Sequence, residues 1–287
     1  MYPREHFRIP LRDRVLELGP RTLILGVLNV TPDSFSDGGR YFKLADAVKR
    51  AWEIADEGAD ILELGGESTR PGSEGVTAEE EMRRIVPVLE GLRGSYPLPV
   101  SIDTSKEEVA QAALERGAAI INDVTSLNKS PGIGPLAARF GAALVLMHMR
   151  GRPSNMQLLP PSPDIVAELE KWSVEAVART RKLGVSSDKI ILDPGIGFGK
   201  TVSQNLEILR NLNRLTKAGF PLLVGTSRKS FIGTLLNRPA GERIFGTAAS
   251  VAVSIMYGAH IVRVHDVAAM RDVAAFMDAL ASERSEA

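Results

Sequence analysis

The chain has no cysteine among its 287 residues, no excess of either charge and no long apolar run. Without cysteine it can form no disulfide framework, no thiolate metal site and no catalytic thiol. Lysine plus arginine number 35, as do aspartate plus glutamate, so the composition gives no sign of a nucleic-acid-binding surface. No apolar run reaches the length of a membrane span, and residues 1–10 lack the apolar stretch of a signal peptide. We therefore expect a cytoplasmic protein that contacts neither membrane nor nucleic acid.

The chain has enough apolar residues to bury a sizeable core, because they make up 44% of it. Intrinsic disorder is therefore excluded. No proline- or serine-rich linker and no shift in composition divides the sequence. We expect one domain over residues 21–287, with residues 1–20 as an N-terminal flap across one end of it.

Short apolar segments alternate along the chain with segments of helical periodicity. The expected strands are 22–30, 61–64, 99–103, 119–124, 143–148, 189–193, 222–226 and 261–265. The expected helices are 44–57, 77–92, 105–116, 135–140, 164–183, 205–218, 231–236, 242–257 and 267–282. Strands that alternate with helices indicate parallel βα crossovers, and eight of them favour a closed (β/α)₈ TIM barrel. A doubly wound open sheet is the alternative.

The stretch 189–200, KIILDPGIGFGK, is the most informative segment of the sequence. An apolar, β-branched run predicts a buried strand that ends at Asp193, because Pro194 cannot continue a sheet ladder. The glycines that follow allow a close backbone approach, so the segment can present a carboxylate to a ligand. Two nucleotide-binding motifs are excluded. The phosphate loop needs glycine where Pro194 stands, and the dinucleotide fingerprint needs a different glycine spacing.

Every expected strand ends in a hydrogen-bonding or ionisable side chain. These residues are Asn29, Glu63, Asp103, Asn122, Asp123, His148, Asp193, Ser227, Lys229, Arg263 and His265. In a parallel barrel the strand ends meet at one mouth, where the chemistry of such folds is found. The alternative for any one of these residues is a structural role, as a helix cap or as a buried group with hydrogen-bond partners. Asp123 and Asp266 fit this alternative best.

The types of these residues indicate a ligand. Asp103, Asn122 and Asp193 offer acceptors to a planar heterocycle with adjacent N–H donors, such as a 2-aminopyrimidinone. Lys229 can donate to a ring carbonyl or nitrogen. Arg263 and His265 alternate on the last strand and so point to the same side, which indicates an anion site for phosphate. A structural ion pair is the alternative for Arg263.

Two long polar loops follow the first two strands, at 29–42 and 65–76. They are rich in glycine and carry the aromatic Phe35 and the basic Arg70. Such weakly anchored loops suit lids that close over a substrate.

The sequence resembles the dihydropteroate synthase family at all of these strand ends. The matching motifs are GVLNVTPDSFSDGG (26–39), GGESTRPG (65–72), SIDTSK (101–106), INDV (121–124), LMHMRG (146–151), LDPGIGFGK (192–200), SRKS (227–230) and RVHDV (263–267). The resemblance implies a (β/α)₈ barrel that couples p-aminobenzoate to 6-hydroxymethyl-7,8-dihydropterin pyrophosphate, giving 7,8-dihydropteroate and pyrophosphate in folate biosynthesis.

The resemblance also implies roles for individual residues. The residues implied to hold the pterin are Asp103, Asn122, Asp193 and Lys229. Asn29 would ligate Mg²⁺ together with the pyrophosphate, and those implied to contact phosphate are Thr69, Arg263 and His265. The p-aminobenzoate side would be formed by Phe198, Arg70 and Ser227, with Phe35, Asp37 and Pro71 closing over it. The residues expected to act on the reacting groups are Asn29, Asp37, Arg70, Lys229, Arg263 and His265.

One position departs from the family pattern, since Glu63 stands where the family usually has aspartate. The extra methylene can move the carboxylate by about 1.5 Å, so we do not place Glu63 in contact with substrate. The implied chemistry needs no nucleophilic side chain, because charge stabilisation on departing pyrophosphate and positioning of the arylamine suffice. A pterin-binding methyltransferase barrel and a non-catalytic pterin-binding paralogue are the alternatives.

The segment 242–257 predicts an interface between subunits. It carries no charge between Arg243 and Tyr257, whereas an outer barrel helix should show a charged face to water. Either neighbouring helices cover it or a second copy of the chain does. We expect a homodimer through the C-terminal helices, with close approach at Gly246, Ala248, Ala249 and Ala252.

Overall fold

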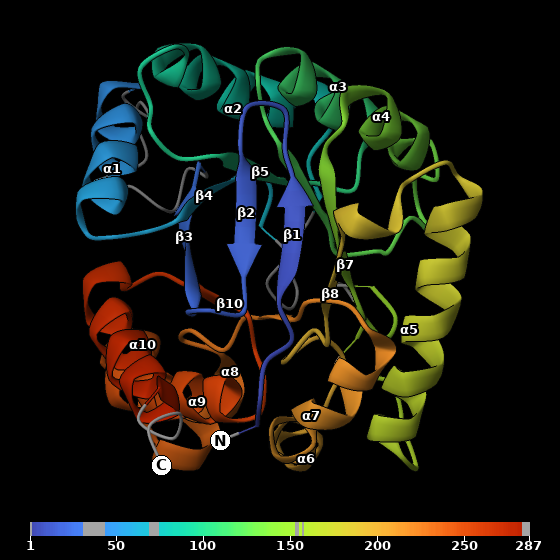
Figure 1. Ribbon diagram of the computed structural model, residues 1–287, viewed down its shortest axis with the longest axis vertical. Helices are drawn as coiled ribbons and strands as arrows, with labels where there is room; N and C mark the ends of the chain where they lie inside the picture. The colour runs from blue at the N-terminus through green and yellow to red at the C-terminus, as the bar shows by residue number, and fades with distance from the viewer. Residues whose placement is uncertain (1, 31–43, 69–74, 153–154, 157, 283–287) are drawn as a thin grey trace.

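In the computed structural model, parallel strands form one closed sheet surrounded by helices (Figure 1). The structure describes the chain except for residues 1, 31–43, 69–74, 153–154, 157 and 283–287. The strands of the sheet are β3 (Leu23–Asn29), β4 (Ile61–Gly65), β5 (Val100–Asp103), β6 (Ile120–Asp123), β7 (Ala143–Met147), β8 (Ile190–Asp193), β9 (Leu223–Val224) and β10 (Ile261–Val264). They are ordered β8-β7-β6-β5-β4-β3-β10-β9. A parallel bridge from Leu192 to Leu222 joins the two outer strands, so the barrel prediction is confirmed.

The helices lie outside the barrel. They are α1 (Leu44–Asp56), α2 (Ala78–Leu92), α3 (Glu107–Glu115), α4 (Ile133–Phe140), α5 (Ile165–Lys182), α6 (Val202–Arg210), α7 (Leu212–Leu215), α8 (Ser230–Leu236), α9 (Ile244–Met256) and α10 (Val267–Ser282). Short 3₁₀ turns occur at Ser187–Lys189, Thr216–Ala218 and Ala240–Glu242. One buried apolar cluster runs between the strands and the inner faces of the helices. Among the described residues, no helix is long and apolar enough to cross a membrane.

The structure differs from the predicted elements at a few boundaries. The helix expected over 205–218 begins at Val202 and breaks after Arg210. It starts early because Thr201 and Gln204 form a reciprocal capping box, in which each side chain bonds the other's backbone N–H, at 3.2 and 3.1 Å. The strand expected over 222–226 is shorter, since it spans Leu223–Val224 with an isolated bridge at Leu222. The remaining boundaries shift by a few residues, as helix and strand ends commonly do.

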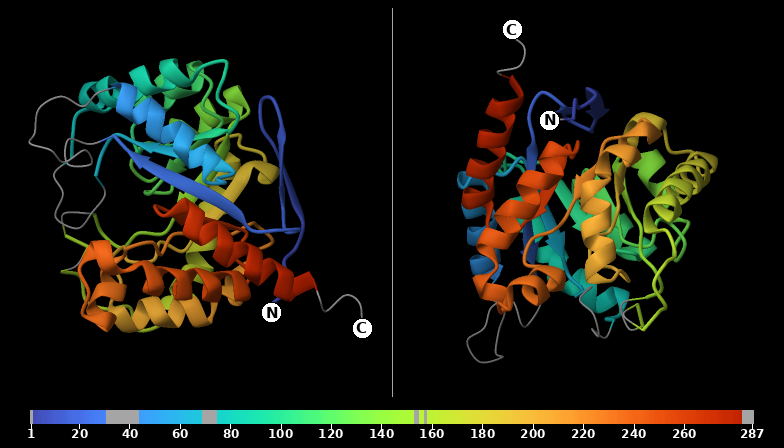
Figure 2. Two further views of the ribbon diagram at one scale, coloured as in Figure 1. Left: turned by 90° about the vertical axis from the view of Figure 1, so that its left-hand side faces the viewer. Right: turned by 90° about the horizontal axis from the view of Figure 1, so that it is seen from below.

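The N-terminal segment closes one end of the barrel. Strands β1 (Phe7–Pro10) and β2 (Val15–Leu18) form an antiparallel hairpin that lies across this end (Figure 2, left). Its inward side chains join a buried cluster with residues from the starts of the barrel strands. The hairpin members are Ile9, Leu11, Leu16 and Leu18. Burial of each such side chain contributes about 1.5–3 kcal/mol, so the hairpin serves as the floor of the barrel.

The C-terminal helices correct part of the sequence interpretation. Gly246 does not face outward, because a Cβ at this position would lie 2.4 Å from Ile232 of the neighbouring α8. Ala248 and Ala252 are half-buried and pack against the core, whereas Ala249 is exposed. The helix is therefore rotated so that Gly246 serves the contact between α8 and α9 within one chain.

The two faces of β2 provide a test of the floor. Leu18 is fully buried and Val15 is 41% exposed, so the two side chains point to opposite faces of the same strand. Leu18→Ala should lower the free energy of unfolding by about 2–5 kcal/mol because it leaves a cavity. Val15→Ala, the matched control, should change it by less than about 0.5 kcal/mol. Equal effects of the two variants in urea titrations would show that the hairpin does not pack into the barrel.

Candidate active site

A pocket lies at the C-terminal ends of the strands, where the sequence placed it. It is lined by Asp103, Asn122, Val124, Met147, Asp193, Gly195, Ile196, Phe198, Gly225, Lys229 and Arg263. Six of these residues are predicted site residues, and they come from β5, β6, β8 and β10 and from the loops after β8 and β9. These strand ends therefore converge on one pocket, as predicted from the sequence. The free space among the side chains is small, about 10 Å³.

The loop after β8 is folded tightly against its own backbone. The Asp193 carboxylate accepts a 2.7 Å hydrogen bond from the N–H of Gly195. Gly195 has φ +64°, and a Cβ there would lie 2.0 Å from the carbonyl oxygen of His148. No other residue type fits this position, because both the backbone conformation and the contact exclude a side chain. The glycine thus allows a close approach to neighbouring backbone, besides lining the pocket.

Lys200 is a structural residue of this loop that the sequence analysis did not single out. Its buried Nζ donates to the carbonyl oxygens of Gly195 at 2.8 Å, Phe198 at 3.1 Å and His148 at 3.2 Å. A buried ammonium group needs such acceptors, and burial lowers the pKa of Lys200 to about 7. The signal in the sequence is a lysine that follows three alternating glycines in GIGFGK (195–200). The turns at these glycines leave backbone carbonyl groups that need hydrogen-bond donors.

Glu63 lies beneath the residues that line the pocket. It is fully buried and accepts hydrogen bonds from Arg263 Nε and, at 2.8 Å, from Asn122 Nδ2. Arg263 Nη2 in turn lies 3.0 Å from Asp103 Oδ2. Glu63 does not line the pocket, in agreement with the sequence interpretation. It acts as a positioning residue that orients a guanidinium and an amide above it.

The orientation of Asn122 leaves one acceptor for a ligand. Because Nδ2 donates to Glu63, Oδ1 points away from that carboxylate. Asn122 Oδ1 is buried and has no hydrogen-bond partner within the described part of the chain. A buried acceptor without a partner is costly, and a ligand N–H would satisfy it.

Burial moves the pKa values of three ionisable groups in the pocket toward pH 7. Burial raises the pKa of Asp103 to about 7, and the nearby Glu63 carboxylate adds to the rise. Burial raises the pKa of Asp193 to about 6. Burial also lowers the pKa of Lys229 to about 8, with a further lowering by Arg263. Perturbed groups that gather in one pocket are typical of functional sites.

One wall of the pocket is apolar. Phe198 is buried and clusters with Val124, Met147 and Met156. Lys229 Nζ lies 4.0 Å from the centre of the Phe198 ring, which is a cation–π contact. The lysine precedes the first residue of α8, so its ammonium group reaches the pocket from the turn between β9 and that helix.

Ser227 and His265 lie together at the ends of β9 and β10. The Ser227 Oγ accepts from the backbone N–H of His265 at 3.2 Å and lies 3.0 Å from the ring Nδ1. Burial and the charge of Arg263 lower the pKa of His265 to about 3, so its ring is neutral at pH 7. At an anion site it would therefore offer a hydrogen bond and no charge.

The structure shows local partners for three residues at the strand ends. Arg263 forms ion pairs with Glu63 and Asp103, as the ion-pair alternative stated. Asp123 accepts from the N–H groups of Thr125 and Leu127, at 2.8 and 2.7 Å. Asp266 pairs with Arg228. The last two carboxylates are satisfied locally and serve the fold.

Asn29 lies at the mouth beside β4 and β5. A Cβ at Gly65 would lie 3.2 Å from Asn29 Oδ1 and 3.8 Å from the Asp103 Cβ. Within the described ranges no group of three acidic or histidine side chains could hold a metal ion. Mg²⁺ commonly takes one or two protein oxygens plus phosphate oxygens of a substrate, so a single amide oxygen fits such an ion. The predicted Phe35, Asp37, Thr69, Arg70 and Pro71 lie outside the described residues.

Removal of the Glu63 charge should lower the pKa of Asp103. Glu63→Gln keeps the shape of the side chain but removes the charge that helps to raise the pKa of Asp103. The pKa of Asp103 should therefore fall from about 7 toward its ordinary value of 3.8, as followed by NMR titration of ¹³C-labelled aspartate. Glu175→Gln on α5, with an exposed side chain, should leave it unchanged. A value still near 7 in Glu63→Gln would mean that burial alone causes the shift.

Comparisons with known proteins agree with this geometry. The family model described as pterin binding enzyme matches residues 25–265. The chain is 45% identical over 273 residues to the dihydropteroate synthase of Synechocystis sp., covering 95% of this chain and 94% of the relative. It is 46% identical over 267 residues to that of Escherichia coli K12, covering 92% and 94%.

Solved structures give the same result. A Yersinia pestis dihydropteroate synthase in a sulfonamide drug complex matches with a TM-score of 0.91 at 40% identity, over 96% of this chain and 100% of that one. A Xanthomonas albilineans dihydropteroate synthase with 4-aminobenzoic acid matches with a TM-score of 0.89 at 41% identity, over 96% and 98%. The chain therefore belongs to the dihydropteroate synthase family of pterin-binding enzymes.

Proposed function

We propose that this chain condenses p-aminobenzoate with 6-hydroxymethyl-7,8-dihydropterin pyrophosphate, giving 7,8-dihydropteroate and pyrophosphate in folate biosynthesis. The observation that carries the proposal is a set of buried acceptors in one pocket. Asn122 Oδ1 has no hydrogen-bond partner among the described residues, and the carboxylates of Asp103 and Asp193 line the same pocket. The pterin ring presents an amino group and ring N–H groups along one edge. That edge would match the acceptors, and Lys229, which lines the same pocket, would donate to the ring carbonyl.

Binding of the ring requires long side chains to move, since the free space is about 10 Å³. Arg263 and Lys229 are the long side chains in the lining. A ring N–H that takes the place of Arg263 Nη2 on Asp103 would free that nitrogen, while Nε stays on Glu63. The freed N–H group can then donate to the pyrophosphate. In this way the resting ion pair of Arg263 and its proposed contact with phosphate become two states of one side chain.

The pyrophosphate lies on the side of Asn29 and His265 in this proposal. Asn29 would hold Mg²⁺, which supplies positive charge to the leaving oxygens when it is bound. The His265 ring is neutral, and its Nδ1 is in hydrogen-bond contact with Ser227 Oγ. Nε2 is therefore the ring atom that could donate to a phosphate oxygen. Thr69, on the loop after β4, is proposed to contact the same group.

The reaction needs placement and charge more than proton transfer. The carbon–oxygen bond to pyrophosphate breaks with both electrons leaving on oxygen, and the pterin ring delocalises the positive charge left on the methylene carbon. The amine nitrogen of p-aminobenzoate forms the new bond and loses a proton to solvent. Phe198 and Ser227 are proposed to line the p-aminobenzoate side, and Phe35, Asp37, Arg70 and Pro71 to close over it.

Turnover and pterin binding together test the proposal. Purified protein with Mg²⁺ should form dihydropteroate and pyrophosphate in equal amounts from the two substrates. Asp193→Asn should weaken pterin binding in calorimetry by about 2–4 kcal/mol, because a buried charged acceptor is lost. Asp188→Asn, an exposed aspartate just before β8, is the matched control and should bind normally. Wild-type protein that binds pterin but releases no pyrophosphate would instead support a non-catalytic paralogue.

A homodimer through the C-terminal helices is the second part of the proposal. Helices α9 and α10 pack side by side (Figure 1, orange to red), and both expose large apolar side chains. On α9, Phe245 is 85% and Met256 42% exposed, and on α10, Phe276 is 66% and Leu280 46% exposed. Neighbouring helices of the same chain therefore do not cover this face. A second copy would bury it by a two-fold contact.

Disruption of this face should separate the subunits. Ala249→Arg places a charge beside the exposed Phe245 without altering the core, because Ala249 is exposed. Sedimentation at micromolar concentration should show a dimer for the wild type and the 31.0 kDa monomer for this variant. Val174→Arg is the control, because Val174 is 68% exposed on α5, and it should remain dimeric. A wild-type chain that sediments as a monomer would contradict the proposed assembly.

A further inference from the structure

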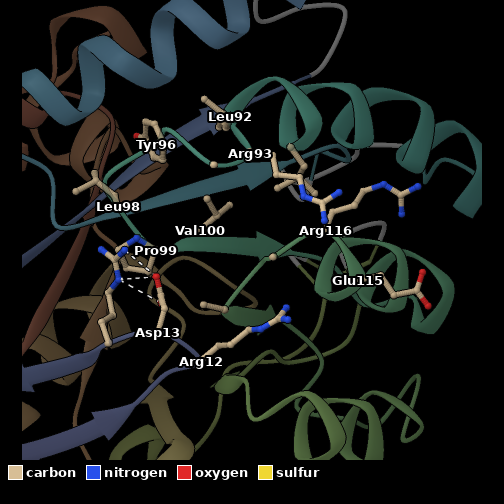
Figure 3. Close-up of a pocket in the computed structure, with 15 residues that line it drawn as sticks. Arg12, Asp13, Leu92, Arg93, Tyr96, Leu98, Pro99, Val100, Glu115 and Arg116 are labelled. Carbon is tan, nitrogen blue, oxygen red and sulfur yellow. Dashed lines mark hydrogen bonds and ion pairs between the residues drawn. The ribbon is translucent and has the colours of Figure 1, made fainter.

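A second and larger cavity lies at the opposite end of the barrel from the candidate active site. It is open to solvent on one side and has a volume of about 540 Å³, between the tip of the β1–β2 hairpin and the C-terminal ends of α2 and α3 (Figure 3). Val100 and Ala119, at or next to the first residues of β5 and β6, belong to its lining. The pterin-site residues Asp103 and Asn122 lie at the other ends of these two strands. A ligand in this cavity would therefore not overlap with the substrates.

The inner wall of the cavity is apolar. Leu89, Leu92 and Val100 are buried, and Leu98 and Tyr96 are half-buried beside them. The Tyr96 hydroxyl donates a 2.8 Å hydrogen bond to the carbonyl oxygen of Ala51, which fixes its ring. The wall offers a preformed surface for a flat apolar group.

The rim of the cavity is basic. Its arginines are Arg12, Arg14, Arg93 and Arg116, against the acids Asp13 and Glu115. Arg14 pairs with Asp13 at 2.9 Å, and Arg116 pairs with Glu90 at 3.2 Å. Arg12 and Arg93 make no side-chain hydrogen bond or ion pair within the described part of the chain. Arg12 extends from the hairpin toward the helix ends that carry Arg93 and Arg116 (Figure 3), so the two unpaired guanidinium groups belong to opposite walls.

We propose that this cavity binds a small anion with a flat apolar body, an aryl phosphate or aryl carboxylate. Its volume lies within the range of small-molecule sites, about 300–1,000 Å³. Guanidinium groups bind phosphate and carboxylate through paired N–H donors and also stack on flat rings. An uncharged ligand would make no ion pair with the two unpaired arginines, which are exposed to solvent. A long nucleic acid does not suit the site, because the apolar surface lies in one compact depression and not along a stripe.

Three ligands that share one ring system test the proposal by calorimetry on the wild-type protein. They are naphthyl phosphate, naphthoate and the uncharged naphthol. At least one of the two anions should bind at a single site, with at least a tenfold higher affinity than naphthol. The stronger of the two shows whether the site takes phosphate or carboxylate. Binding should also weaken as salt is added, because the arginine rim is solvent-accessible.

Matched variants locate the site. The double substitution Arg12→Gln with Arg93→Gln should weaken the anion at least tenfold, whereas Arg210→Gln, an exposed arginine on α6, should not. Asp193→Asn should leave anion affinity unchanged, because the two sites lie at opposite ends of the barrel. None of these measurements needs turnover, so they stand or fall independently of the proposed reaction. Absence of saturable binding up to about 1 mM would refute the proposal, as would loss of binding in Asp193→Asn but not in the double variant.

Discussion

The buried Glu63 carboxylate is the interaction on which the geometry of the candidate active site depends. It lies where water does not reach, so its charge must be balanced by neighbouring donors. Arg263 and Asn122 provide them, and both side chains are thereby fixed in orientation. The carboxamide oxygen of Asn122 and the guanidinium of Arg263 then face the pocket from above Glu63. One charge outside the pocket lining thus sets the direction of two groups that line the pocket.

The barrel supplies the spacing between these groups. In the ladder Asp103 is paired with Asn122 and with Gly65, which is in turn paired with Asn29. Neighbouring strands lie about 4.8 Å apart, so the ends of four successive strands face one mouth at a fixed separation, and three of the four residues paired there are polar. The hairpin floor at the other end fills the barrel interior with apolar side chains. The strands are therefore held at one end by packing and carry their polar groups at the other.

Much of this site could be predicted from the sequence, because its signals are local. An apolar run that ends in one polar residue marks a strand end, and Asp103, Asn122 and Asp193 were found in this way. The contacts that could not be predicted join residues far apart in the chain. Asn122 and Arg263 are 59 and 200 positions from Glu63, and nothing local indicates that they share it. The rotation of α9, which turns Gly246 toward α8, depends likewise on packing between helices.

The resting ion pairs also bear on how the pocket would select its ligand. Asp103 is buried and bonded to Arg263, so a ligand that binds Asp103 has to compete with an existing interaction. A ring with N–H donors would replace the guanidinium on Asp103, and the number of hydrogen bonds would then be maintained. A ring of the same shape without donors would displace Arg263 and leave a buried carboxylate without a partner, at a cost of about 1–3 kcal/mol or more. A pocket that already holds this ion pair therefore discriminates between ligands by their hydrogen-bond donors. A cavity of the same size without the ion pair would accept any ring that fits.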